Sequence, residues 1–412
     1  MGGRRLSRTG PPLRPCQSGS RAQCPRRLAT GPAGRPVVTP PDGGITLVGH
    51  AFAPSGRGED VRCSFRALAA AGVSSRVLDI YGLSVHDPDH EAEMGAAVTR
   101  ELGTGVNLFH INGDEIDQAL RHLGAEDLPK GRNVIYPNWE LSCYPADWAE
   151  QLERFDEIWA PSRFVLDGLR QATATPVYHM PLATEVRLRS FLGRRAFGIP
   201  EGSYVFLFFF DFTSFIARKN PFAAVEAFAQ LVKARPHDNV TFVIKLNNSR
   251  QRTRDFEEFQ RRIEPFRNRI LIIDRALSDN EMKNLVRLSD CFISLHRSEG
   301  YGRGLAEAMF LGKPVIATGY SGNMDFTTPE TALLVDYTLV PVEDGSYPRS
   351  GGQVWADADT ARAAAHMVRL LDDPAFGRAL GRKAGLHMRR SFAYPAIGLR
   401  YRDRIEAMET SC

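Results

Sequence analysis

Short apolar segments alternate with longer amphipathic segments along most of this chain, and this alternation restricts the fold more than any other feature. Apolar runs of about four to eight residues bounded by turn residues predict buried strands, and the longer segments between them predict helices. Strands that alternate with helices form parallel sheets wrapped by helices. At 412 residues the chain is too long for one ordinary core. We therefore expect an α/β protein with two parallel-sheet domains.

The predicted strands fall into two series, which a polar, arginine-rich stretch near residues 183–200 separates. The first series comprises residues 45–49, 75–80, 105–111, 133–136, 157–160 and 176–180. The second comprises residues 204–210, 240–245, 269–273, 291–295 and 314–317. Helices are expected at residues 60–71, from the capping residue Ser162 to about 171, and at 394–408. Ligands are expected in the cleft between two such domains, at the carboxyl ends of the strands.

Residues 1–41 differ in composition from the rest, because they contain eight arginines and no acidic residue and are rich in Pro, Gly and Ser. A segment of this kind buries too little apolar surface to fold, so we expect a disordered leader. The leader accounts for the formal charge of +4, and the remainder is mildly acidic. The charge therefore indicates no nucleic-acid partner, and contact of the leader with anionic lipid stays open.

The six cysteines are scattered, without a C-x-x-C pair or a histidine spacing that would build a zinc site. They are typical of free thiols in a reducing cytoplasm. The most apolar run, residues 204–210, is much shorter than the roughly 20 residues that a membrane-spanning helix needs. We expect a cytoplasmic protein, soluble or peripheral at the inner membrane face, with no metal site.

The segment from Arg297 to Met309, RSEGYGRGLAEAM, is the strongest functional signal in the chain. It follows a predicted strand and opens a helix expected at residues 305–311. The strand-to-helix turn contains three glycines, Gly300, Gly302 and Gly304. These glycines allow the backbone to approach a ligand, and the N–H groups of the first helical turn favour a pyrophosphate. Glu299 and Glu307 flank the turn, where their carboxylates would accept hydrogen bonds from sugar hydroxyls.

The spacing of Glu299 and Glu307, with seven residues between them and an aromatic-Gly pair after the first, resembles the donor-site signature of retaining glycosyltransferases of family four. Four other segments are similar to that family and occur in its order: residues 156–164, 218–221, 312–318 and 320–325. The resemblance extends from about residue 44 to the end and implies the GT-B fold, two Rossmann-like domains facing each other across a cleft. After the disordered leader (1–41), the expected parts are an N-terminal acceptor domain (42–190), a C-terminal nucleotide-sugar donor domain (191–390) and a last helix crossing back to the first domain (391–412).

The resemblance also implies roles for two carboxylates and two cations. Glu299 would contact hydroxyls of the donor sugar, and Glu307 would bind the ribose hydroxyls of the nucleotide. Arg218 and Lys219 would neutralise the leaving diphosphate. Ser214 stands where the family commonly has another Arg, so the division of labour between the two cations stays open. The other donor-site candidates are Gly300, Tyr301, Gly302, Arg303, Gly304, Ser321, Gly322 and Asn323. For the last three of these, an ordinary turn is the alternative.

The first domain offers weaker candidates. They are Gly56, Gly58 and Arg62 in a second glycine-rich turn, Asn112 and Asp114 after a strand, and Trp139 after the next strand. The turn would lie by the reacting phosphate or the acceptor, with a tight turn as the alternative, and it lacks the fingerprints of dinucleotide enzymes and phosphate-loop ATPases. Asn112 stands where many family members have a second His, and it or Asp114 would face the transferred sugar. Trp139 would either support a sugar face or pack in the domain.

The expected function is transfer of a hexose from a UDP- or GDP-linked sugar to a glycan, lipid or small-molecule acceptor, as in polysaccharide biosynthesis. The resemblance implies retention of configuration by a metal-independent, front-face route in which the leaving phosphate takes the acceptor's proton, and it implies no cofactor. No D-x-D segment in an expected place indicates a metal-held diphosphate. Two alternatives stay open, a glycosyl phosphorylase of the same architecture and a scaffold that binds sugar nucleotides without turnover.

Overall fold

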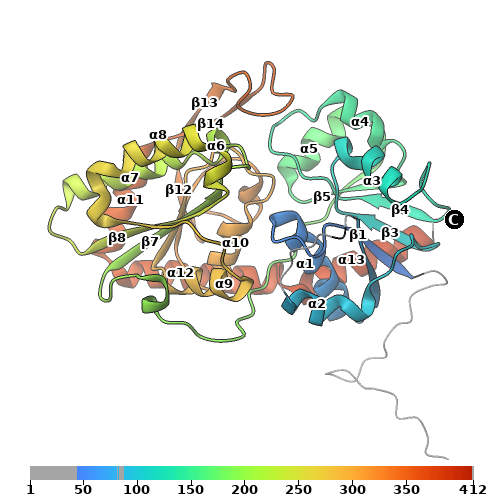
Figure 1. Cartoon of the computed structure of the whole chain (residues 1–412), viewed down its shortest axis with the longest axis horizontal. Coiled ribbons are helices and arrows are strands. Elements are labelled where there is room, and N and C mark those ends of the chain that lie inside the picture. The colour runs from blue at the N-terminus through green and yellow to red at the C-terminus, as the bar shows by residue number, and fades with distance from the viewer. Residues whose placement is uncertain (1–43, 81, 83–87, 411–412) are drawn as a thin grey trace, which may run out of the picture. The chain divides into compact units, whose positions relative to one another are not determined.

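The computed structural model describes residues 44–80, 82 and 88–410, and Figure 1 shows its helices and strands. The expected disordered leader, residues 1–41, lies outside the described residues. The described chain contains two six-stranded sheets in which each strand runs parallel to its neighbours. The predicted α/β class with two parallel sheets is therefore confirmed.

The first sheet has the strand order β2-β1-β3-β4-β5-β6. Its strands are β1 (Ile45–Gly49), β2 (Ser75–Asp79), β3 (Val106–Phe109), β4 (Arg132–Ile135), β5 (Glu157–Ala160) and β6 (Val177–His179). Its helices are α1 (Gly56–Ala70), α2 (Pro88–Met94), α3 (Ile116–His122), α4 (Ala146–Leu152) and α5 (Arg163–Ala172). Because β1, β3 and β4 are adjacent and parallel, the loops that follow them lie at one edge of the sheet.

The second sheet has the order β12-β11-β10-β7-β8-β9. Its strands are β7 (Tyr204–Asp211), β8 (Val240–Asn247), β9 (Ile270–Ile273), β10 (Cys291–Ser294), β11 (Val315–Thr318) and β12 (Leu333–Val335). The helices of this half are α6 (Ile216–Lys219), α7 (Pro221–Ala234), α8 (Thr253–Ile263), α9 (Asp279–Leu288), α10 (Arg303–Phe310), α11 (Thr360–Asp372) and α12 (Pro374–Ser391). Short 3-10 helices lie at Gly95–Ala97, Gly113–Glu115, Arg194–Phe197, Ser249–Gln251, Glu264–Arg269 and Gly322–Asp325.

Strand β7 shows why the two sheets are so apolar. Its even-numbered side chains, Phe206, Phe208 and Phe210, pack into one core cluster, whereas Val205 and Leu207 pack into another. Both faces of the strand are therefore buried beneath helices, which is the usual environment of a parallel strand. The near-continuous apolar run at residues 204–210 is a consequence of this two-sided burial.

Several features differ from the sequence expectations. Strand β12 was not predicted, and helix α10 begins at Arg303 rather than at residue 305. Helix α1 begins at Gly56 rather than near residue 60, because Ser55 caps it by accepting a hydrogen bond from the Gly58 N–H at 3.3 Å. The glycine-rich segment expected as a turn is thus the first turn of a helix. The antiparallel hairpin of β13 (Tyr337–Pro341) and β14 (Val354–Ala358) was not predicted from the sequence.

The last helix, α13 (Tyr394–Glu409), packs against elements of the first sheet (Figure 1). It approaches α1 so closely that a Cβ atom at Gly398 would lie 1.9 Å from the carbonyl oxygen of Ala67. The Tyr401 hydroxyl is 3.3 Å from that of Tyr136 and donates to the Pro181 carbonyl at 3.0 Å. These contacts join the C-terminal end of the chain to its N-terminal half.

Within the described residues, no helix combines the length and the apolar character that crossing a bilayer requires. The described cysteines, Cys63, Cys143 and Cys291, form no disulfide with one another.

Candidate active site

A compact charged cluster lies where α6 meets the segment after β10. The Lys219 Nζ atom is 2.6 Å from Oε1 of Glu299, and Arg218 Nη1 donates to Oε2 of Glu299 at 3.1 Å. Arg218 also donates to the Ser298 carbonyl at 3.1 Å. Burial alone would raise the pKa of Glu299, but Lys219 and Arg218 lower it to about 2. Burial lowers the pKa of Lys219, against the opposing effect of Glu299. The structure thus brings three predicted site residues together in one ion-pair cluster.

The backbone around α6 explains how two adjacent cations reach the same carboxylate. Phe215 before the helix and Asn220 after it both have left-handed backbone conformations, with φ angles of 59° and 50°. Non-glycine residues rarely adopt this region, so the surrounding structure must hold the short helix in place. The Asn220 side chain then caps α7 by accepting from the Ala223 N–H at 3.4 Å. Ser214 contributes its carbonyl oxygen, to which Arg218 Nη2 donates at 3.4 Å.

The glycine-rich turn before α10 lies against the first sheet's loops. A Cβ atom at Gly300 would be 2.8 Å from the carbonyl oxygen of Trp139, and one at Gly322 would be 2.1 Å from the Gly300 carbonyl oxygen. The Ser162 hydroxyl donates to the same Gly300 carbonyl at 2.6 Å. Gly302 has a φ angle of 94°, which favours glycine. Three chain segments therefore meet at Gly300 without room for a side chain.

The other residues of this turn are engaged in contacts between the two halves of the chain. The Tyr301 hydroxyl donates to the Leu182 carbonyl at 2.9 Å and lies 3.0 Å from the Thr184 hydroxyl. Arg303 pairs with Asp60 of α1, which also accepts from Asn138 Nδ2 at 2.8 Å. Gly304 lies under the ring of Phe209, which a Cβ atom there would approach to 2.7 Å. Sequence reasoning missed Asp60, whose partner is more than two hundred residues away.

Glu307 lies on α10 in a crowded ionic environment. Burial raises its pKa to about 7, although Arg303 and Lys283 act in the opposite direction. Its carboxylate is thus close to the balance between protonated and charged forms at neutral pH. The protonation state of such a group responds strongly to a neighbouring ligand that donates hydrogen bonds.

The segment after β11 shapes the turn around Glu299. The Ser321 hydroxyl accepts a hydrogen bond from the Glu299 N–H at 2.8 Å. The Asn323 side chain is fully buried and bonds to His296 Nε2 at 3.0 Å and to the Thr318 carbonyl at 3.1 Å. Gly322 N–H donates to the Glu299 carbonyl at 2.8 Å. In this structure these groups support the position of Glu299 by internal hydrogen bonds.

The weaker candidate residues of the first half mainly contact residues of their own loops. Arg62 is buried and holds the loop before α1 through the Ala51 and Ala53 carbonyls, at 2.8 Å and 3.0 Å. Gly58 allows close packing there, because a Cβ atom would be 2.2 Å from the Ala53 carbonyl oxygen, whereas Gly56 has open space around it.

Asn112 and Asp114 begin the loop after β3. Asn112 caps the 3-10 helix Gly113–Glu115, and its Oδ1 atom accepts from the Asn138 N–H at 2.9 Å. Burial and the neighbouring Glu115 raise the pKa of Asp114. This loop therefore connects to the loop after β4, which carries Asn138.

Trp139 lies in an aromatic cluster. Its side chain is buried, with 2% of the residue exposed, and its ring packs against Tyr144, Trp148 and Tyr347 at centroid distances of 5.7, 5.3 and 5.3 Å. The indole N–H donates to the Cys143 carbonyl at 2.8 Å. Of the two roles considered for Trp139, the structure shows the packing role.

Glu140 is the second residue that sequence reasoning missed. Its Oε1 atom lies 3.6 Å from Nη2 of Arg218, and its Oε2 atom accepts a hydrogen bond from the Tyr347 hydroxyl. Glu140 follows β4, whereas Tyr347 lies between β13 and β14. The only sequence signal for Glu140 was that it follows a predicted strand, next to Trp139.

A pocket of about 660 Å3 opens beside the carboxyl end of β2. Phe52, Ile80 and Val98 give its wall apolar surface, and Asp79 and Arg100 add charge of both signs. Such a mixed lining suits a ligand that has both apolar and hydroxylated surface.

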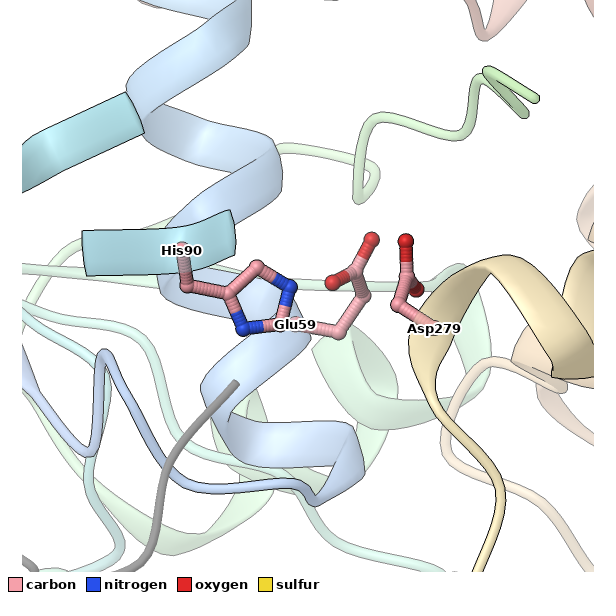
Figure 2. Close-up of side chains that lie close together, drawn as sticks. All are labelled: Glu59, His90 and Asp279. Atoms are coloured by element: carbon pink, nitrogen blue, oxygen red, sulfur yellow. The ribbon is translucent and has the colours of Figure 1, made fainter. Parts of the chain in front are cut away.

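Glu59, His90 and Asp279 form the cluster drawn in Figure 2, contributed by α1, α2 and α9. Each residue offers one possible metal-ligand atom, and these atoms lie within 4.8 Å of one another. The carboxylates already have cationic partners, because Glu59 binds Arg62 at 2.7 Å and Asp279 binds Lys283 at 2.6 Å. A metal ion would have to displace these partners, so the arrangement favours an ion-pair network.

The comparisons with known structures concern the fold. HepE of Anabaena in complex with UDP-glucose superposes with a TM-score of 0.62 at 14% identity, over 89% of this chain and 99% of HepE. Sucrose-phosphate synthase of Thermosynechococcus elongatus superposes with a TM-score of 0.62 at 16% identity, over 89% and 99% of the two chains. The fold is GT-B. A third similar structure, the N-terminal domain of Candida albicans trehalose-6-phosphate phosphatase, has a TM-score of 0.60 at 11% identity, over 88% of this chain and 97% of that domain.

Part of the second half of this GT-B protein is similar in sequence to a protein family. Residues 193–338, which make up less than half of the chain, match the family described as Glycosyl transferases group 1. No curated protein matches the sequence. The matched region contains Lys219, Glu299 and Glu307, and it supports a glycosyltransferase.

Proposed function

We propose that this protein is a retaining glycosyltransferase of family four that transfers a hexose from a nucleotide diphosphate sugar. The observation that carries the proposal is the cluster of Glu299, Lys219 and Arg218 beside the glycine-rich start of α10, within the region that matches group 1 glycosyl transferases. HepE, whose fold is similar, has been solved with UDP and with UDP-glucose. This likeness supports a nucleotide sugar as donor, with UDP or GDP as the nucleotide.

In the proposed reaction, the bond between the sugar C1 atom and the phosphate oxygen breaks while the acceptor oxygen bonds to C1 on the same face. The acceptor's proton moves to the leaving phosphate oxygen, so the protein supplies no strong base. Lys219 and Arg218 would stabilise the charge that builds on the diphosphate, together with the N–H groups at the start of α10. Glu299 would hold hydroxyls of the donor sugar, and Glu307 would hold the ribose. The route uses neither a metal ion nor a cofactor.

The first half of the chain would bind the acceptor, which we propose is a glycan, a lipid-linked sugar or a small molecule. The pocket beside β2 supports this assignment, because it lies in that half and has both apolar and charged walls. We propose a cytoplasmic location with peripheral contact at the inner membrane face and a role in polysaccharide biosynthesis.

Release of nucleoside diphosphate from a panel of UDP- and GDP-hexoses, with and without EDTA, tests the proposal. The wild-type protein is compared with Glu307→Ala and Lys219→Ala. Release that survives EDTA and is lost in both variants supports a metal-independent transferase and identifies its donor. If the donor sugar binds but no nucleoside diphosphate is released with any acceptor tried, the protein is a scaffold. If turnover requires inorganic phosphate, the protein is a phosphorylase.

A further inference from the structure

The guanidinium of Arg218 lies between two carboxylates that belong to different sheets. Its Nη1 atom donates to Glu299 at 3.1 Å, and its Nη2 atom lies 3.6 Å from Oε1 of Glu140. Glu299 follows β10 of the second sheet, whereas Glu140 follows β4 of the first. Burial lowers the pKa of Arg218, but Glu140 and Glu299 raise it by more, so the guanidinium stays charged.

With Lys219 included, this cluster contains two cations and two carboxylates and is electrically neutral. A nucleoside diphosphate brings further negative charge, and it can form charge-assisted hydrogen bonds with the guanidinium in place of a carboxylate. We therefore expect one of the two carboxylates to leave the guanidinium when a diphosphate binds.

Glu140 is held less tightly than Glu299. The Glu299 side chain is 13% exposed and lies 2.6 Å from Lys219 Nζ, and its backbone N–H donates to Ser321. The Glu140 side chain is 21% exposed and lies farther from Arg218 than Glu299 does. Because the longer and more exposed ion pair is the weaker one, a diphosphate displaces Glu140 from Arg218 and leaves Glu299 in place.

Tyr347 would keep the displaced carboxylate in position. Its hydroxyl donates to Oε2 of Glu140, and its ring packs against Phe215 and Trp139 at centroid distances of 4.9 and 5.3 Å. Tyr347 belongs to the segment between β13 and β14 of the hairpin in Figure 1. The Oε1 atom that now faces Arg218 would become an open hydrogen-bond acceptor on the side of the first sheet.

We propose that Oε1 of Glu140 is the binding site for a hydroxyl of the acceptor sugar, and that it forms only after the donor diphosphate has taken over Arg218. The donor consequently binds before the acceptor. Glu140 positions the acceptor and takes no proton from it. This inference rests on the proposed glycosyltransferase function and adds a substrate group, a sugar hydroxyl, and an order of binding.

Glu140→Gln tests the inference, because it removes the charge and keeps the shape and the bond to Tyr347. Calorimetry with UDP and GDP measures the affinity for the diphosphate. We expect about five-fold tighter binding in Glu140→Gln, since the cluster gains one net positive charge. Glu185→Gln is the matched control, because the Glu185 side chain is 20% exposed and pairs with Arg187 at 3.0 Å away from the cluster. The control should bind UDP and GDP as the wild type does.

Saturation-transfer NMR with methyl α-glucoside and methyl α-mannoside tests the hydroxyl site. We expect one of these sugars to contact the wild-type protein only when UDP or GDP is present, and we expect the signal to fall about ten-fold or more in Glu140→Gln. Tyr347→Phe, which keeps the Glu140 charge, should leave diphosphate affinity unchanged and weaken sugar binding to a smaller extent.

The outcomes separate this inference from the proposed function. If wild-type protein binds neither UDP nor GDP, the proposed function fails and the inference fails with it. If the diphosphate binds with equal affinity to wild-type protein and Glu140→Gln, the inference alone is overturned. Sugar binding that is independent of nucleotide, equal in the two proteins or absent altogether would also overturn it.

Discussion

The Nζ atom of Lys219 lies 2.6 Å from Oε1 of Glu299, although eighty residues separate them in the chain. This ion pair joins α6 to the segment between β10 and α10, and a second cation, Arg218, contacts the same carboxylate at 3.1 Å. Without a ligand, the carboxylate satisfies both cations in a site with little exposure to water. Under the proposed function, a diphosphate would share both cations with Glu299.

Replacing Lys219 with Ala should reduce kcat by about 100- to 1,000-fold, because one of the charges that stabilise the leaving diphosphate is lost. Release of nucleoside diphosphate from the best donor sugar measures the effect. Lys219→Arg should retain part of the activity, and Lys233→Ala, at an exposed position on α7, should retain all of it. Equal rates for Lys219→Ala and wild type would contradict the role of Lys219.

Folding stability should depend on pH through Glu307. Burial raises its pKa in the folded protein to about 7, whereas a glutamate in the unfolded chain has a pKa of about 4.3. The protonated form therefore favours the folded state, so this contribution is fully present below about pH 4.3 and is lost as the pH rises through about 7. Glu307→Gln should remove this decline, which is at most about 4 kcal/mol.

Urea denaturation of wild type and Glu307→Gln between pH 5 and pH 8 is the measurement for this pH dependence. The difference in unfolding free energy between the two proteins should grow with pH. A difference that stays constant over this range would show that the pKa of Glu307 is not raised.

The pair of Arg303 and Asp60 should contribute to the stability of the whole described unit. Asp60 is almost fully buried, so Asp60→Ala leaves the Arg303 charge without its partner and should cost about 3 kcal/mol. Arg349→Ala removes an exposed pair with Asp147 and should cost less than about 1 kcal/mol. Chemical denaturation measures both values, and a similar small loss in both variants would argue against a stabilising role.

Gly398→Ala should destabilise the protein by at least about 2 kcal/mol, because the added Cβ atom would lie 1.9 Å from the Ala67 carbonyl oxygen. Helix α13 would have to move away from α1 to relieve this clash. Gly351→Ala is the control, since no atom lies within 4 Å of a Cβ atom there. A thermal midpoint for Gly398→Ala equal to that of the control would show that the two helices separate at little cost.

The strands and the donor-side turn were predictable because their signals are local. The mostly apolar run of β1 and the near-continuous apolar run of β7 indicate the two-sided burial that is usual for a parallel strand. The turn from Gly300 to Gly302 was predictable for a similar reason, since its glycines lie between a strand and a helix. Even so, helix α1 began earlier than expected, because the cap at Ser55 outweighed the two glycines that follow it.

The contacts across the two halves of the chain were not predictable from spacing. Glu140 and Arg218 are 78 residues apart, and Asp60 and Arg303 are 243 residues apart. Neither pair therefore produces a periodic pattern in the sequence. The hairpin of β13 and β14 places Tyr347 beside Glu140, but the sequence of the hairpin contains no motif that predicts this contact. Trp139 was equally open, because an aromatic residue after a strand can face a ligand or a core.

The sequence by itself determined the class of fold, the order of the strands along the chain and the segment around Glu299 and Glu307, because hydrophobic period and turn chemistry act over a few residues. Only the tertiary structure decided which charges neutralise one another. That outcome depends on the distance between atoms on different sheets and on how much water reaches them, and both quantities arise only when the complete chain is packed.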